Sequence, residues 1–172
     1  MKILLIIIIL LTLLGCKKDN SAQTVPYVDL EKFMGDWHVI SILPNPIEKN
    51  AVNSIESYQF NQNGGIDITY AFYKGSPEGK KKVMHPKANV YNTETGSEWR
   101  VQFIWPLKFP YLIIWLDDEY ETTVIGVPNK KYAWVMSRKP EIAPEKYSKI
   151  TAHMAELGYD ISKLKEIPQI WK

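Results

Sequence analysis

Hydrophobic and polar residues alternate with period two in short runs through the central part of the chain, residues 37–137. This alternation is typical of β-strands that bury one face. Turn signals such as Asn63-Gly64-Gly65 separate the runs, and residues 74–82 read as an exposed turn. We predict strands over residues 37–41, 55–60, 66–70, 87–91, 99–105, 111–116, 121–127 and 132–137, with an interruption at 106–110. About eight short strands joined by turns favour a closed antiparallel barrel or a sandwich.

Helical patterns flank this β-region. Residues 28–33 predict one short helical turn. Pro144 lies in the first turn of a longer helix that runs to about Leu157 and is ended by Gly158. Ile150 and Met154 lie with Leu157 on one apolar stripe of this helix. Residues 161–170 predict a short extended tail.

The N-terminal segment is apolar from residue 3 to residue 14 and follows Lys2. Its length suits a secretory signal, which needs about 7–15 apolar residues, and is too short for a membrane-spanning helix of about 20. It ends in Leu13-Leu14-Gly15-Cys16, which resembles the bacterial lipobox, where the chain is cut before a cysteine that is then acylated. We therefore expect a signal peptide over residues 1–15, a lipidated N-terminus and tether over 16–26, and one domain over 27–172. A plain signal peptide with an incidental Cys16 is the alternative.

Composition narrows the classes of function. The chain has 21 basic and 19 acidic residues, a near balance that argues against a nucleic-acid partner. The chain has a single cysteine and therefore cannot form an internal disulfide, so a packed core must stabilise the domain. Six Trp, ten Tyr and five Phe indicate large apolar surfaces that line or fill the domain.

Three segments carry a resemblance to a known family. They are Phe33-Met34-Gly35-Asp36-Trp37 at the start of the first strand, Leu116-Asp117-Asp118-Glu119-Tyr120 in the turn between the sixth and seventh strands, and Trp134-Val135-Met136-Ser137-Arg138-Lys139-Pro140 at the end of the eighth strand. In this order, with a lipobox before them and a helix after them, they resemble the lipocalins, and in particular the bacterial outer-membrane lipocalins. The resemblance implies an eight-stranded antiparallel up-and-down barrel with the C-terminal helix packed outside.

The resemblance also implies roles for these residues. Trp37 would plug one end of the barrel, with the Arg138 guanidinium over its ring and bonded to backbone carbonyls of the preceding turn. Gly35 would permit this close approach. Asp117 and Tyr120 would belong to a structural turn rather than to a catalytic or metal-binding cluster.

The inward face follows from period two once one residue is fixed. If Trp37 points inward, so do Val39 and Ser41, and if Arg138 closes the inside, Met136 and Trp134 share its face. The family pattern adds Tyr58, Ile68, Tyr70, Val101, Phe103, Ile113 and Trp115. This set suits an acyl chain. Alternatively, the side chains fill the barrel, with Tyr70, Trp115 and Trp134 narrowing it.

A carboxylate and three histidines complete the candidate chemistry. Glu56 falls on the inward register, where it is costly unless paired or near the open end. His38, His85 and His153 are isolated in sequence, with no metal-ligand spacing and no nucleophile–base pair. We expect no catalytic residue, no metal and no cofactor.

We therefore predict a membrane-anchored lipid-binding protein of the Gram-negative outer membrane that stores or transports single-chain lipids for envelope maintenance. Lysophospholipids and fatty acids are the expected ligands, and the anchor is the expected membrane contact. Lys17 after the cysteine lacks the acidic inner-membrane retention signal. The oligomeric state is open between monomer and homodimer. The alternative functions are a barrel enzyme acting on a small apolar substrate and a haem or pigment binder.

Overall fold

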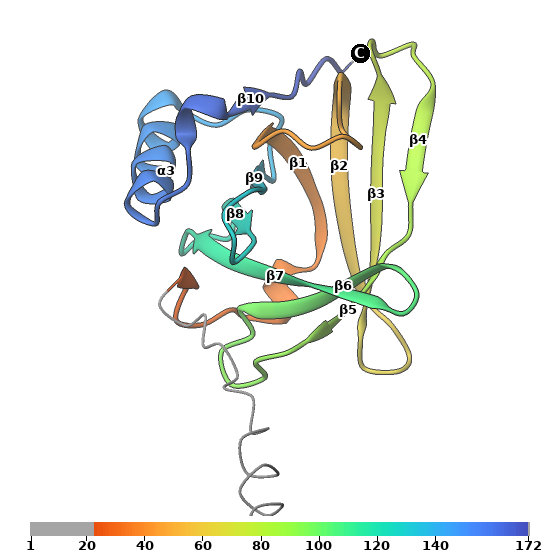
Figure 1. The fold of residues 1–172 in the computed structure, drawn as a ribbon, viewed down its shortest axis with the longest axis vertical. Coiled ribbons are helices and arrows are strands. Elements are labelled where there is room, and N and C mark those ends of the chain that lie inside the picture. Colours follow the sequence, from red (N-terminus) through yellow and green to blue (C-terminus); the bar gives the residue numbers. More distant parts are fainter. Residues whose placement is uncertain (1–22, 172) are drawn as a thin grey trace, which may run out of the picture.

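The computed structural model describes residues 23–171 as a closed antiparallel β-barrel with a helix against its outer surface (Figure 1). Cys16 and the expected signal peptide lie outside the described residues. The elements, in chain order, are α2 (Leu30–Phe33), β1 (Gly35–Ile42), β2 (Ala51–Phe60), β3 (Ile66–Lys74), β4 (Lys81–Met84), β5 (Lys87–Val90), β6 (Glu98–Ile104), β7 (Leu107–Leu116), β8 (Thr122–Gly126), β9 (Ala133–Ser137), α3 (Pro144–Glu156), the 3₁₀ turn η3 (Ile161–Lys163) and β10 (Lys165–Glu166).

The barrel has eight strand positions because β4 and β5 together occupy a single position beside β3. Both pair with β3, and they are separated only by His85 and Pro86. Antiparallel pairing continues from β5 through β6, β7 and β8 to β9, and β9 pairs with β1 to close the sheet. The two-residue strand β10 adds to β1 from outside this circle. The predicted all-β barrel with a C-terminal helix is confirmed.

Two local predictions are wrong. Residues 81–82 belong to strand β4 rather than to the exposed turn, because exposed lysines are tolerated on a strand that pairs with β3 alone. Strand β7 begins at Leu107 and includes Pro110, where an interruption was expected. Pro110 pairs with Arg100 of β6, and β8 joins β7 only from Leu112 onward, so this proline occupies an edge position.

Two apolar cores stabilise the molecule. One fills the barrel, and the other lies between the outer wall and α3, where Ile150 and Met154 are fully buried against Leu112 and Val135. Gly158 ends the helical segment with a φ of +85°, a conformation that glycine adopts without strain. The apolar stripe predicted from the sequence is therefore the docking face of α3.

The two ends of the barrel differ. In an up-and-down barrel alternate connections share one end, so residues 61–65, 91–97 and 117–121 lie together with α2, and we call this the closed end. Residues 43–50, 75–80, 105–106 and 127–132 form the opposite, open end. Figure 1 shows the hairpin of β6 and β7 projecting at the right of the molecule.

Candidate functional site

Trp37 plugs the closed end. Its side chain is fully buried and its indole Nε1 donates to the carbonyl of Phe33 at 2.9 Å. The guanidinium carbon of Arg138 lies 3.8 Å from the centre of the indole ring, which is a cation–π contact. The predicted pairing of Trp37 and Arg138 is present.

Arg138 also ties the N-terminal turn to the barrel. Its Nη1 donates to the carbonyl of Asp36 at 2.8 Å, and its Nη2 donates to that of Lys32 at 2.7 Å. Further bonds from this guanidinium reach the carbonyls of Phe33, Met34 and Tyr120. Gly35 has a φ of +93°, and a Cβ there would lie 3.3 Å from Nη1 of Arg138. The planar guanidinium of Arg138 therefore donates hydrogen bonds to several carbonyls at the end of α2 that have no partner within the helix.

Asp117 and Tyr120 are structural. The Asp117 carboxylate accepts the backbone N–H groups of Glu121 and Thr122 and pairs with Lys146 of α3 at 2.7 Å. The Tyr120 hydroxyl accepts the backbone N–H of Asp29 at 2.7 Å. These bonds fasten the turn between β7 and β8 to the helix on one side and to α2 on the other.

Most of the residues predicted to face inward do so. The apolar cluster inside the barrel contains Val39, Tyr58, Ile68, Tyr70, Val101, Ile113, Trp134 and Met136. Tyr58 and Trp134 come from distant parts of the chain and share this interior. Residues assigned inward by period two and by the family pattern thus lie in one apolar cluster.

Ser41 faces outward, contrary to the prediction. The pairing of β1 with β9 shifts between Val39 and Ser41, which marks a β-bulge. The bulge turns Ser41 to the outside, where it accepts a 2.8 Å hydrogen bond from Tyr147 of α3, and brings Ile42 inside. Ser41 is therefore a contact to α3 rather than part of a ligand site.

Trp115 is displaced outward in the same way. The register of β7 against β8 shifts between Ile113 and Trp115. The Trp115 ring lies 5.5 Å from the ring of His153 on α3, and its Nε1 donates to Thr122. One extra residue in a strand reverses the face of every residue after it until the register is restored.

Phe103 lies on the rim rather than inside. Its side chain is 48% exposed and packs against Phe109 with 6.4 Å between ring centres. A register shift between Val101 and Ile104 precedes the end of the hairpin. Phe103 therefore belongs to the open end of the barrel.

Glu56 is buried in the interior, as the register predicted. The hydroxyls of Tyr58 and Tyr111 both donate to its Oε2, the latter at 2.9 Å. Burial raises the pKa of the Glu56 carboxyl, and the two tyrosine bonds offset part of the rise. The tyrosines satisfy a group that would otherwise be very costly inside an apolar barrel.

Glu48 is a second buried carboxylate, and it was not predicted. It belongs to the connection 43–50 at the open end, yet it is only 4% exposed. The hydroxyl of Tyr70 donates to it, and the indole Nε1 of Trp134 lies 3.0 Å from each of its oxygens. Burial, with a smaller contribution from the charge of Glu56, raises the pKa of Glu48 to about 7. These bonds hold the connection 43–50 over the interior.

Aromatic rings narrow the barrel between these carboxylates and the plug. Trp99 stacks on Tyr111 at 5.7 Å, and Tyr111 stacks on Trp134 at 6.4 Å. The ring of Phe33 packs on Trp37 in a tilted arrangement. Tyr58 and Trp99 in turn pack against Phe33, the first tilted and the second edge-on. The lower half of the interior is thus packed with rings, although of the three residues expected to narrow the barrel, Tyr70, Trp115 and Trp134, only Trp134 takes part in this stack and Trp115 faces outward.

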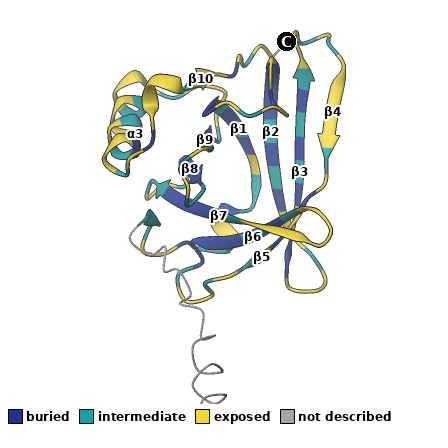
Figure 2. Ribbon diagram, in the orientation of Figure 1, coloured by how far each residue is buried: buried dark blue, intermediate teal, exposed yellow. Residues whose placement is uncertain are grey.

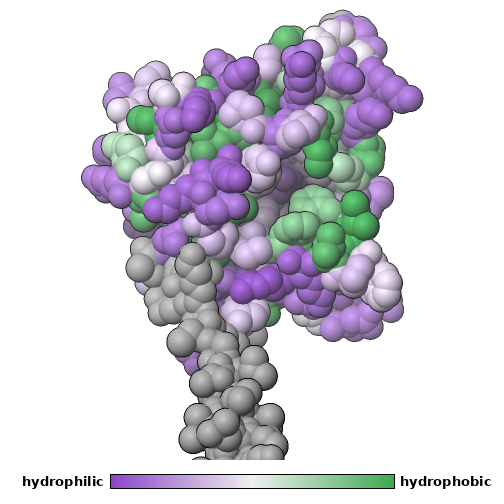
Figure 3. Space-filling model, viewed as in Figure 1, coloured by the Kyte–Doolittle hydropathy of each residue, from purple (hydrophilic) through white to green (hydrophobic). Residues whose placement is uncertain are grey.

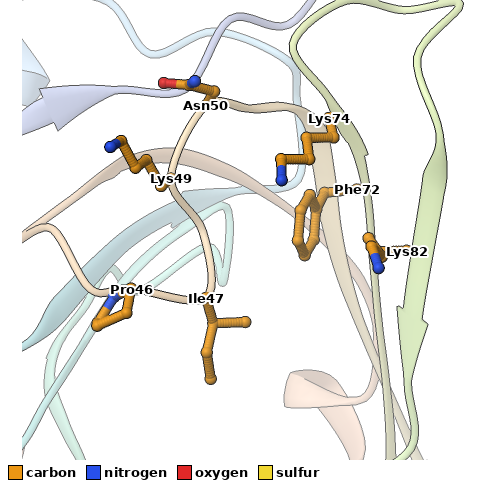
Figure 4. A pocket seen from close by; sticks show the side chains of 7 residues that line it. All are labelled: Pro46, Ile47, Lys49, Asn50, Phe72, Lys74 and Lys82. Atoms are coloured by element: carbon orange, nitrogen blue, oxygen red, sulfur yellow. The ribbon is translucent and has the colours of Figure 1, made fainter.

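A cavity of about 430 Å³ opens at the mouth of the barrel (Figure 4). Phe72, Lys74 and Lys82 line it from β3 and β4, and the connection 43–50 lines the other side with Pro46, Ile47, Lys49 and Asn50. Phe72 is also part of the interior apolar cluster. The cavity therefore borders the interior apolar cluster at Phe72 and carries cationic side chains at its edge.

Comparison with known proteins agrees with this geometry. A family model described as a lipocalin-like domain matches residues 28–169. The chain belongs to the lipocalin family. It is similar to outer membrane lipoprotein Blc of Vibrio cholerae, with 26% identity over 98% of this chain and 99% of the relative. It is also similar to temperature-induced lipocalin-1 of Arabidopsis thaliana, with 28% identity over 88% of this chain and 85% of the relative.

Solved structures agree on the fold of this lipocalin. Insecticyanin of Manduca sexta superposes with a TM-score of 0.66 at 18% identity, covering 87% of this chain and 84% of that one. Lobster apocrustacyanin A1 superposes with a TM-score of 0.67 at 14% identity, covering 90% and 94%. At these identities the likeness concerns the barrel itself.

The three histidines of this lipocalin lie away from the interior. His38 contacts Gln169 and Trp171, His85 contacts Thr69, and His153 contacts the carbonyl of Ile114. Within residues 23–171, no group of three histidine, cysteine or acidic side chains is arranged to hold a metal ion. In the same range, no helix combines the length and apolar character that crossing a membrane requires.

Proposed function

We propose that this lipocalin binds single-chain lipids in the upper half of its barrel and stores or transports them at the outer membrane of a Gram-negative bacterium. The observation that carries the proposal is the interior apolar cluster, which extends from Ile42, Phe72 and Trp134 near the mouth to Tyr111 below them. Family membership supports the binding of a small hydrophobic ligand. Similarity to outer membrane lipoprotein Blc of Vibrio cholerae supports the membrane location.

The energetics favour one acyl chain. Burying a fourteen-carbon chain yields about 11 kcal/mol at about 0.8 kcal/mol per methylene. Association and ordering cost several kcal/mol, which leaves an affinity of roughly micromolar to nanomolar. The stacked rings of Trp99 and Tyr111 occupy the lower interior, so a second chain has less room than the first. A lysophospholipid or a fatty acid therefore fits better than a two-chain phospholipid.

The buried carboxylates bear on the polar end of the ligand. Glu48 and Glu56 are both acidic, and Glu48 lies beside the mouth where a head group would rest. The charged form of Glu48 attracts the amine of a zwitterionic head group while Lys49, Lys74 and Lys82 at the cavity edge attract its phosphate, whereas a fatty-acid carboxylate pairs with these lysines but meets like charge at Glu48. We therefore expect lysophospholipids to bind more tightly than fatty acids of the same chain length.

Substituting Ile42 with tryptophan is expected to weaken lipid binding at least tenfold, because this buried side chain faces the interior beside its cross-strand neighbour Trp134. Thr69→Trp is the matched control, since Thr69 lies between inward Ile68 and Tyr70 and contacts His85 outside. The measurement is a tryptophan-fluorescence titration with a lysophospholipid and with the fatty acid of equal length, and circular dichroism checks the fold.

Equal affinities of folded Ile42→Trp and Thr69→Trp would place the lipid outside the barrel. Tighter binding of the fatty acid by the parent chain would contradict the role given to Glu48. Absence of saturable binding of either lipid would contradict the carrier function itself.

The anchor is proposed at Cys16, with residues 1–15 removed and residues 16–26 as the tether. Cys16→Ser is expected to leave the chain uncleaved or to let a salt wash release it from membranes. A single acyl chain binds a bilayer only marginally, whereas two or more hold firmly. Membrane fractionation after a salt wash measures this. If the variant still carried a lipid by mass spectrometry, the acylated residue would have to be another one.

A further inference from the structure

The end of the β6–β7 hairpin is an exposed apolar surface. Five large side chains in residues 103–109, here called the apolar tip, are solvent-exposed: Phe103 at 48%, Ile104 at 71%, Trp105 at 83%, Leu107 at 56% and Phe109 at 47%. Figure 2 shows this hairpin end as exposed, and Figure 3 shows hydrophobic side chains gathered at the right of the same face. Single exposed apolar residues are ordinary, whereas a contiguous group marks a surface that another body covers.

The apolar tip extends beyond the neighbouring strands. Strand β5 pairs with β6 only as far as Gln102, and β8 pairs with β7 only from Leu112 onward. Within the tip, Ile104 pairs with Leu107 and Phe109 pairs with Val101 of β6, and no third described strand pairs with residues 104–109. The tip lies at the open end, as does Ile47, which is 59% exposed in the connection 43–50.

Charge is distributed unequally between the two ends. The open-end connections and their flanking residues carry lysines at positions 49, 74, 80, 81, 82, 108, 130 and 131. The acids in the same segments are Glu78 and the buried Glu48. The closed-end turn 117–121 has the sequence Asp-Asp-Glu-Tyr-Glu. The near-neutral net charge of +2 thus conceals a basic open end and an acidic turn at the closed end.

We propose that the open end docks on a lipid bilayer containing anionic lipid, with the apolar tip inserted among the head groups. Aromatic side chains such as Trp105 favour the membrane–water interface, and apolar side chains beside lysines are the composition of interfacial anchors. Lysines around the mouth gain from the negative surface potential, whereas the acidic turn at the opposite end is repelled by it. This orientation places the mouth of the barrel on the membrane surface, and it depends neither on Cys16 nor on which lipid is bound.

Vesicle co-sedimentation tests the docking surface. A chain that begins at Lys17 omits Cys16 and keeps every described residue, 23–171. We expect it to sediment with phosphatidylcholine vesicles containing about 30% phosphatidylglycerol, and about tenfold less with phosphatidylcholine alone. Ile104→Ser combined with Trp105→Ser is expected to lower partitioning to the mixed vesicles about tenfold or more. The matched control is Phe60→Ser with Ile161→Ser, which removes two exposed apolar residues away from the tip and is expected to change partitioning less than twofold.

Several results would overturn the proposal. Equal partitioning of the tip variant and the parent chain would exclude the tip as the membrane contact. Equal loss in the tip variant and the control would mean that surface hydrophobicity alone drives sedimentation. The parent chain could also fail to bind vesicles and form a dimer that the tip substitutions dissociate. In that case the tip would be an interface between two copies of the chain. An unchanged lipid titration of the tip variant in the absence of vesicles, together with its loss of vesicle binding, would support docking as a function separate from ligand binding.

Discussion

Replacing Trp37 with alanine is expected to lower the free energy of unfolding by about 3–5 kcal/mol, as for a large aromatic side chain removed from a core. The side chain is fully buried, and its ring is packed 5.1 Å from that of Phe33. The substitution removes the ring, the hydrogen bond to the Phe33 carbonyl and the surface on which Arg138 rests. Urea unfolding followed by circular dichroism measures the loss.

Arg138→Ala is expected to cost less, because water reaches part of this half-buried side chain and can bond some of the released carbonyls. The 3.8 Å contact with Trp37 predicts that the two losses are not additive, with a coupling of about 0.5–2 kcal/mol in a double-mutant cycle. Arg138→Lys tests the contribution of the planar guanidinium, since lysine keeps the charge but loses the multiple hydrogen bonds to backbone carbonyls. Strict additivity of Trp37→Ala and Arg138→Ala would show that ring and guanidinium stabilise the closed end independently.

The strands and the helix α3 were predictable because their hydrophobic periods are regular. Strand β3 alternates cleanly, and Ile68 and Tyr70, which the family pattern placed inward, lie inward. The helix was marked at its start by Pro144 and after its end by Gly158. The Trp37–Arg138 plug came instead from the resemblance to lipocalins, since no local pattern joins residues so distant in sequence.

The faces of Ser41 and Trp115 could not be read from the sequence. Residues 112–116, Leu-Ile-Ile-Trp-Leu, are all apolar, so no alternation reveals the register shift between Ile113 and Trp115. Around Ser41 the sequence does alternate, but the bulge between Val39 and Ser41 shifts its phase. Bulges are set by tertiary pairing, in this case beside the strand pairs on which α3 packs.

Glu48 was missed for a different reason. The segment Pro44-Asn45-Pro46-Ile47-Glu48-Lys49-Asn50 has the composition of an exposed turn, and nothing in it indicates burial of one acid. The partners that bury Glu48 are Tyr70 and Trp134, which lie 22 and 86 residues away. Only the closed barrel brings these three side chains together.

This buried carboxyl predicts a stability that falls as the pH rises. Burial raises the pKa of Glu48 in the folded chain from its ordinary value of 4.5 to about 7. Below pH 4.5 the carboxyl is protonated in both states and favours neither. Between pH 4.5 and about 7 the unfolded chain loses this proton while the folded chain retains it, so rising pH favours unfolding. Above pH 7 the carboxyl is ionised in both states, and the folded state bears the full cost of burying its charge, which is about 3 kcal/mol.

Glu48→Gln is expected to remove this pH dependence, because an amide keeps an oxygen for the Tyr70 hydroxyl and does not ionise. The difference in unfolding free energy between parent and variant should shift by about 3 kcal/mol in favour of the variant between pH 4 and pH 8. Urea denaturation at intervals across this range measures it. Glu94→Gln, in the exposed closed-end connection 91–97, is the matched control and should leave the parent profile unchanged. A parent and a Glu48→Gln chain with parallel profiles would mean that Glu48 reaches solvent, and that its burial beneath the connection 43–50 does not persist in solution.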